Sequence, residues 1–225
     1  MNHIDLGSPS KRAIELPFTA FTYDTISCDY LPVPDKLPPI NFSDVLHSRC
    51  SRRDFGPLSE QQLSAFLWYS SKTISVRLEE SGYLWEHRPA PSAGGRHPLD
   101  LLVTNYGEMK SDFYLYDPFS HALRRTRTDQ EQTVPLSHEI TKIIPLGSGV
   151  IIWHVAQFVK TLSKYSSGES LVWRDAGALL GIKSLVAEAL RLKFCGIGIT
   201  GEPWLSTMLR SNGKVVGVGG CLIGS

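Results

Sequence analysis

Two arginines and a serine occupy alternate positions in residues 49–53, Arg-Cys-Ser-Arg-Arg, just after a predicted short helix. At this spacing the side chains of Arg49, Ser51 and Arg53 can point together at one phosphate group. Such a set suits a terminal phosphate monoester. A solvated basic turn is the alternative interpretation, because short basic runs are common.

A loop of prolines, glycines and other small residues lies just before a predicted strand, at residues 89–98, Pro-Ala-Pro-Ser-Ala-Gly-Gly-Arg-His-Pro. Small residues allow backbone amides to approach a flat or anionic ligand closely. Loops with so many turn-forming residues also serve simply as connections. The loop by itself therefore leaves both interpretations open.

A third segment begins with Arg174-Asp175-Ala176-Gly177, which enters a predicted long helix, and continues at residues 194–204. There Gly196, Gly198 and Gly201 have the spacing of a dinucleotide-binding fingerprint. That fingerprint requires a strand before it and a helix that opens within it. Here the sequence predicts a helix before the glycines, and Pro203 follows them. The segment is therefore not interpreted as a dinucleotide site.

The elements that must position these segments are predicted as mixed helices and strands. Ser43 is a plausible N-cap of a short helix through His47, and Ser59 with Gln62 forms a capping box for a second helix. Residue patterns predict strands at 99–105, 113–116, 122–125, 150–155 and 214–223, with the second and third of them forming a hairpin.

A long helix with few polar residues is predicted over residues 172–193 and is expected to be buried. Gly177 and Gly181 lie one turn apart on it, and glycine costs about 1 kcal/mol in a helix interior. Close approach of another backbone would explain both glycines. A subunit interface is one place where such an approach occurs.

Composition limits the classes of partner. With 23 basic and 22 acidic residues, the net charge of +1 gives no electrostatic reason to expect nucleic acid or an anionic membrane as a partner. The four cysteines form no CxxC pair, so neither a metal site nor a dense disulfide framework is expected. A polar N-terminus and the lack of a membrane-length apolar run predict a cytoplasmic protein.

Residues 1–40 are expected to form a proline-rich arm, and residues 41–225 a single domain. Five prolines between positions 17 and 39 disfavour helices in this region. Its aromatic residues exceed what disordered segments usually carry. The arm is therefore expected to pack on the body of the protein or on a partner.

Taken together and in this order, the three segments resemble the nitroreductase superfamily. Chains of that superfamily begin with an Arg-x-Ser-x-Arg phosphate motif, continue with a Pro-Ser-rich loop before a strand, and carry a glycine loop after a long central helix. Residues 52–59, Leu67-Trp68 and residues 88–98 look most like the SagB-type, thiazole- or oxazole-forming branch with its Pro-Ser-Ala-Gly signature. The resemblance spans roughly residues 41–224, and its specificity lies in the ordered combination.

The resemblance implies an α+β, nitroreductase-like fold with a mostly antiparallel sheet flanked by helices and a long buried central helix. It also implies a homodimer that binds flavin mononucleotide (FMN) at the subunit interface. By this resemblance Arg49, Ser51 and Arg53 hold the phosphate and ribityl end, and Gly196 and Gly198 offer amides to the flavin edge. The residues expected to line the isoalloxazine ring are Pro91, Ser92, Ala93, Gly94 and Gly95.

The chain departs from SagB-type sequences at a suspected catalytic position, where Arg96-His97 replaces a lysine-tyrosine or leucine-tyrosine pair. His97 is the candidate catalytic base, because imidazole titrates near neutral pH, and Arg96 is named with it. A packing histidine and a solvated arginine are the alternatives. The chain also stops at Ser225, where many nitroreductases continue with further basic residues, and weaker phosphate binding is expected.

The resemblance implies an FMN-dependent dehydrogenase that oxidises an azoline-like or other peptide-derived ring, with other biosynthetic enzymes as potential partners. An NAD(P)H-dependent reductase of nitro compounds or quinones is the nearest alternative. A flavin-poor structural subunit of a biosynthetic complex is a third, motivated by Arg96-His97 and the short C-terminus.

Overall fold

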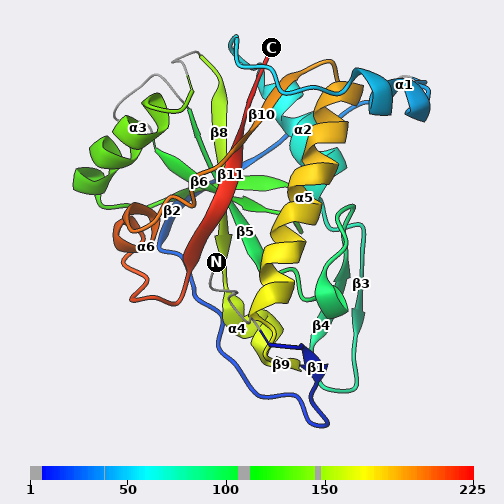
Figure 1. Cartoon of the computed structure of the whole chain (residues 1–225), viewed down its shortest axis with the longest axis vertical. Coiled ribbons are helices and arrows are strands. Elements are labelled where there is room, and N and C mark those ends of the chain that lie inside the picture. The colour runs from blue at the N-terminus through cyan, green and yellow to red at the C-terminus, as the bar shows by residue number, and fades with distance from the viewer. Residues whose placement is uncertain (1–6, 38, 106–111, 145–147) are drawn as a thin grey trace, which may run out of the picture.

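A seven-stranded sheet, antiparallel at every pairing, organises the computed structural model, which describes residues 7–37, 39–105, 112–144 and 148–225 (Figure 1). This sheet with helices on both faces confirms the predicted α+β class. In spatial order its strands are β10 (Lys193–Ile197), β11 (Val216–Gly224), β8 (Val150–Ala156), β5 (Leu99–Asn105), β6 (Phe113–Asp117), β7 (Ala122–Thr126) and β2 (Thr25–Tyr30).

Strand β8 lies near the middle of the sheet, and all seven of its residues are buried. Its side chains alternate between the two faces, since successive residues of a strand point to opposite sides. Val150 and Ile152 pack into one hydrophobic cluster, whereas Ile151 and Trp153 pack into the other. A continuous apolar run was therefore needed here, because both faces of the strand are covered.

Different helices cover the two faces (Figure 1). Helices α2 (Glu60–Ser71) and α5 (Glu169–Ala189) pack on one face, and α3 (Thr133–Thr141) and α6 (Trp204–Met208) on the other. The remaining elements are the helices α1 (Phe42–Ser48) and α4 (Phe158–Leu162), the 3-10 turns η1 (Ala93–Gly95) and η2 (Gln130–Gln132), the hairpin β3 (Ser75–Leu78) and β4 (Leu84–His87), and the short pair β1 (Ser10–Lys11) and β9 (Tyr165–Ser166).

The predicted N-cap of helix α2 is confirmed, and that of helix α1 lies two residues earlier than predicted. The capping box is present, because the Ser59 side chain accepts from the Gln62 amide and the Gln62 side chain accepts from the Ser59 amide. Helix α1 is capped by Asn41 instead of Ser43, and the Asn41 side chain accepts a hydrogen bond from the Ser43 amide at 3.0 Å. Both residue types favour an N-cap, and the chain uses the earlier one.

The long helix is present as α5, but its predicted C-terminal end was wrong. It ends at Ala189, the chain reverses at Arg191 with a φ of +56°, and Lys193 already belongs to strand β10. Leu190 and Leu192 continue the apolar spacing through this turn, which hides the end of the helix in the sequence. Only one side of α5 is buried, because Trp173 is 44% exposed and Gly177 and Gly181 face open space.

Part of the region expected to form an arm contributes to the main sheet. Strand β2 pairs with β7 at the sheet edge, and β1 pairs with β9 farther along the chain. The segment between them follows the outside of the molecule (Figure 1). Positions 1–6 and 38 of the expected arm lie outside the described residues. In the part of the chain that the structure describes, no helix has the length and apolar character required to cross a bilayer.

Candidate functional site

The basic segment follows α1 and lies beside the start of β10. The Arg52 amide donates to the Phe194 carbonyl at 2.9 Å, and the amides of Gly56 and Ser225 each bond to the other residue's carbonyl. Arg49, Ser51 and Arg53 are exposed. Among the described residues their side chains form no hydrogen bond or ion pair, so these three groups are free to bind an anion.

Arg52 has a different role from its neighbours. Its guanidinium bonds both carboxylate oxygens of Glu188 on α5, at 2.6 and 3.3 Å. This contact lowers the pKa of Glu188, because the carboxylate form is stabilised by the adjacent positive charge. Arg52 thereby fixes the segment to the C-terminal end of α5, while the side chains of residues 49, 51 and 53 remain exposed.

The glycines Gly196 and Gly198 lie on and just after the same strand, β10. A Cβ on Gly196 would stand 3.2 Å from Leu180 of α5, so this glycine permits close packing of the strand on the helix. Gly198 is exposed, and a Cβ there would meet nothing within 4 Å. Because Arg52 bonds to Phe194, two residues before Gly196, the structure brings the basic segment and the glycine segment together.

A helix was predicted directly before the glycines, and this prediction was wrong. Strand β10 precedes and includes Gly196. The interpretation against a dinucleotide site still holds for another reason. Strand β10 runs antiparallel to β11, and α6 begins only at Trp204, after all three glycines. The dinucleotide fingerprint instead joins a parallel strand directly to a helix.

The loop at residues 91–97 is held by Asp175 of α5, for which no role was predicted. Its carboxylate accepts the Ser92 hydroxyl at 2.6 Å and the Ala93 amide at 3.1 Å. The Ser92 hydroxyl oxygen in turn accepts the His97 amide at 2.9 Å. Burial raises the pKa of Asp175, and the bonds from Ser92 and Ala93 oppose that shift. Ser92 is therefore a structural part of the loop.

The two glycines of this loop are required by its turn. Gly94 and Gly95 have φ angles of +62° and +64°, which side-chain-bearing residues rarely adopt. A Cβ on Gly95 would overlap the indole of Trp85, and Gly95 itself is buried. Gly95 must be glycine because strand β4 of the β3–β4 hairpin packs directly against it.

We expect Asp175→Ala to lower the free energy of unfolding by about 1–3 kcal/mol, because two partly buried donors lose their acceptor. Asp175→Asn should lose less, since one carbonyl oxygen remains. Urea denaturation of the two variants measures the difference. Arg174→Ala, which removes an exposed side chain one residue earlier on α5, is the matched control and should differ from wild type by less than about 0.5 kcal/mol. An equally stable Asp175→Ala protein would contradict the anchoring role.

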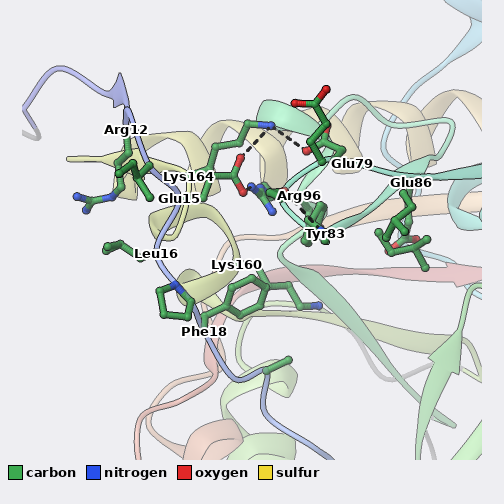
Figure 2. Close-up of a pocket in the computed structure, with 18 of the residues that line it drawn as sticks. Arg12, Glu15, Leu16, Phe18, Glu79, Tyr83, Glu86, Arg96, Lys160 and Lys164 are labelled. Carbon is green, nitrogen blue, oxygen red and sulfur yellow. Dashed lines mark hydrogen bonds and ion pairs between the residues drawn. The ribbon is translucent and has the colours of Figure 1, made fainter.

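The adjacent candidates Arg96 and His97 line different cavities. Arg96 is only 1% exposed, forms an ion pair with Glu15 of the N-terminal region, and stacks 3.8 Å above the Tyr83 ring (Figure 2). The interpretation of Arg96 as a solvated charge is therefore wrong. The structure does not bring Arg96 and His97 together as a pair acting at one point.

His97 is largely buried, and its Nε2 lies 3.1 Å from the carbonyl oxygen of Glu86. Because a carbonyl only accepts, Nε2 carries the proton and Nδ1 is the basic atom. Burial, reinforced by the positive charge of Arg88, lowers the pKa of His97 to about 4. At neutral pH the ring is uncharged, beside a small cavity of about 30 Å³ that Asp175 and Ser92 also line.

The loop and the basic segment lie toward opposite ends of α5. Asp175 holds the loop, and Glu188 holds the basic segment, 13 residues later on the helix (188 − 175). At 1.5 Å per residue their helical positions are about 20 Å apart. Within one chain, these two candidate flavin-binding segments therefore do not form a single contiguous site.

Neither a family model nor a curated protein matches this sequence. Solved structures do match. A candidate nitroreductase from Ralstonia eutropha JMP134 superposes with a TM-score of 0.66 at 21% identity, over 93% of this chain and 97% of that one. The E. coli microcin synthetase McbBCD complex with truncated pro-MccB17 bound matches with a TM-score of 0.60 at 19% identity, over 86% of this chain and 76% of the matched chain.

A third structure, a candidate nitroreductase from Anabaena variabilis, matches with a TM-score of 0.59 at 20% identity, over 86% of this chain and 40% of that one. The likeness to the first structure extends over nearly the whole of both chains. With this antiparallel sheet and the long helix α5, the chain has the nitroreductase fold.

Proposed function

We propose that the chain is an FMN-dependent oxidoreductase that binds the cofactor phosphate through Arg49, Ser51 and Arg53. The observation that carries this proposal is the presence of two exposed arginines whose side chains form no hydrogen bond or ion pair among the described residues, beside the glycine-bearing strand β10 of a nitroreductase fold. The residues fit the group, because free guanidiniums suit a phosphate monoester and the space at Gly198 is open to a flat ring. When bound, FMN supplies a hydride acceptor.

The proposal includes a homodimer. The loop at residues 91–95 lies about 20 Å from the basic segment along α5, so the loop of a second copy is the one expected to line the flavin bound here. The exposed side of α5, with Trp173, Gly177 and Gly181, is the proposed contact surface. Glycines without neighbours there permit another backbone to approach.

For the substrate, we favour the SagB-type dehydrogenase reaction on an azoline-like ring in a peptide. The likeness in fold to a structure of a microcin synthetase complex with truncated pro-MccB17 bound supports this class. Removing two hydrogens from a ring takes a hydride acceptor and a base for the proton. His97 is the proposed base, with the proton moving to Nδ1 while Nε2 stays bonded to the Glu86 carbonyl.

Replacing His97 with alanine is expected to preserve FMN binding and to lower turnover by about 10²–10⁴-fold, the usual contribution of a general base. Because the pKa of His97 lies at about 4, the imidazole is already unprotonated above that pH. The wild-type rate should therefore stay level from pH 8 to pH 5 with respect to this group and fall near pH 4. Steady-state kinetics across this range measure both effects.

His87→Ala is the matched control, since His87 is an exposed histidine on the neighbouring strand β4. It should keep wild-type turnover. Full activity in His97→Ala would remove this histidine from the mechanism and leave it as a packing residue.

The visible absorption spectrum tests whether the protein is an FMN-dependent oxidoreductase. It is recorded after reconstitution with FMN and again after anaerobic addition of NADPH. Bound flavin that stays oxidised would favour the dehydrogenase. Bound flavin that bleaches would favour the NAD(P)H-dependent reductase, a second candidate supported by the higher TM-score of the Ralstonia eutropha structure. Failure to bind flavin would refute the proposal and favour a structural subunit.

A further inference from the structure

A second cavity, of about 1270 Å³, lies away from the basic segment, between the N-terminal region and the hairpin β3–β4 (Figure 2). One wall is residues 12–18, which we call the strap. The opposite wall includes Glu79 and Tyr83 of the hairpin, and Arg96 and Lys164 also line the space. The cavity is thus built from charged groups that the proposed flavin site does not use.

Arg96 is the most deeply buried cation of this cavity. Its guanidinium pairs with the Glu15 carboxylate and lies over the Tyr83 ring, but its Nε has no hydrogen-bond partner in the described structure. Lys164 reaches the same carboxylate at 3.7 Å and Glu79 at 3.6 Å. A buried cation with a second cation beside it is a strong binding site for one carboxylate.

The carboxylate that fills this site belongs to the strap, which lies on the body like a bound peptide. The amides of Arg12 and Leu16 donate to the carbonyls of Lys164 and Ser163, at 2.9 and 2.8 Å. The flanking apolar side chains are poorly buried, with Ile14 82% and Leu16 49% exposed. The strap is therefore held mainly by polar contacts, which also include the bond from the Arg12 guanidinium to the Leu162 carbonyl at 3.0 Å, while Phe18 packs near the Tyr83 ring.

We propose that the surface under the strap, at the edge of this cavity, is a binding site for a peptide segment that carries a carboxylate side chain, and that the strap is the internal ligand seated there. The incoming peptide would place its carboxylate on Arg96 and its backbone amides on the carbonyls of residues 163 and 164. A peptide fits better than a small carboxylate, because the occupant seen here uses both kinds of contact. This proposal does not depend on flavin binding, and its test measures binding alone.

The strap competes at high effective concentration. A tethered ligand acts as if present at a concentration on the order of millimolar, so a free peptide binds the wild-type protein only weakly. Glu15→Gln removes the charge of the internal ligand while retaining its size. Arg96 is then available to the carboxylate of an external peptide.

The test uses full-length protein and a fluorescein-labelled peptide with the strap sequence, Arg-Ala-Ile-Glu-Leu-Pro-Phe, followed by fluorescence anisotropy. The peptide should bind Glu15→Gln about tenfold or more tightly than wild type, the ratio expected for a charge-assisted contact. The same peptide with glutamine for glutamate should lose that gain. Glu80→Gln, an exposed glutamate on the same cavity, is the matched control and should bind as wild type does.

The double variant Glu15→Gln, Arg96→Gln tests the role of the Arg96 cation. It leaves no buried charge unpaired at this position. It should bind the peptide at least about tenfold more weakly than the single variant Glu15→Gln does. Equal binding by these two variants, or equal affinity of wild type and Glu15→Gln, would overturn the proposal. Free glutarate, a carboxylate without a peptide backbone, should compete poorly. Competition by glutarate as strong as by the unlabelled peptide would overturn the assignment to a peptide.

A measurement on the wild-type protein does not depend on any variant folding. Saturating peptide should displace the strap and speed hydrogen exchange at the Leu16 amide, which is protected by its bond to Ser163. Unchanged exchange at Leu16 under saturating peptide would contradict the idea that the strap and the peptide share one site.

Discussion

Simultaneous replacement of Arg49 and Arg53 with alanine is expected to weaken FMN binding by roughly 10²–10⁴-fold. Each charge-assisted contact with a phosphate contributes about 1.5–3 kcal/mol, and two are lost. Both side chains are exposed and form no bond or ion pair in the described structure, so folding should be little affected. The free energy of unfolding should change by less than about 0.5 kcal/mol.

Titration of flavin-free protein, followed by flavin fluorescence, measures this loss. Riboflavin, which lacks the phosphate, sharpens the test, because the double variant should bind it as well as wild type does. The Arg127→Ala, Arg210→Ala protein removes two other exposed arginines, 66% and 77% exposed, and controls for net charge. If FMN affinity fell equally in this control, or stayed unchanged in the first variant, the phosphate assignment would be wrong.

The second large effect is expected at Lys183, through the pH dependence of stability. Between pH 8 and 10.5 the free energy of unfolding of wild type should rise by about 3 kcal/mol relative to Lys183→Met. Lys183 is completely buried, and burial lowers its pKa from 10.5 to about 8. In this window the unfolded chain holds a proton that the folded chain has released, so raising the pH favours the folded state. Below pH 8 the folded state carries the full cost of the buried charge.

The groups that face Lys183 explain why the free-energy cost of burying its positive charge is not offset. Its Nζ lies 2.9 Å from Nε2 of His154 on β8, and burial together with Lys183 keeps the pKa of that histidine well below its usual value. A neutral imidazole accepts a hydrogen bond but supplies no negative charge. Cys221 on β11 is also buried, and burial raises the pKa of its thiol to about 11, so it offers no thiolate at neutral pH.

Denaturant unfolding of wild type and Lys183→Met at several pH values measures how much Lys183 contributes to the pH dependence of stability. Titration of Cys221 has the opposite sign, because its thiol ionises first in the unfolded chain. Lys214→Met, which removes an exposed lysine, is the matched control and should follow wild type in parallel. A parallel curve for Lys183→Met as well would show that Lys183 does not carry the expected penalty.

The sequence by itself determined the elements whose signals are local. The Ser59–Gln62 capping box is a contact between residues three positions apart, and its residue types suffice to predict it. The strands β5, β6, β7 and β8 were predicted from local runs of strand-favouring residues and the turn signals beside them. With the order of the three segments, these elements were enough to predict the nitroreductase fold.

Only the tertiary structure decided the roles of residues whose partners lie far along the chain. Asp175 holds Ser92 from 83 positions away, and Glu15 holds Arg96 from 81 positions away. No periodicity in the sequence records such a contact. Strand β10 was missed for a related reason, because the apolar spacing of α5 continues through the turn at Arg191, and pairing with β11 rather than local propensity makes it a strand.

The neighbouring residues Arg96 and His97 show this division most clearly. Their identities follow from the sequence, and their position after a glycine turn was recognised there. Their separation into two cavities depends on the φ of +41° at His97, on the Glu86 carbonyl that bonds its ring, and on the strap that supplies Glu15. These contacts join three parts of the chain, namely the loop, strand β4 and the strap, and only folding brings them together.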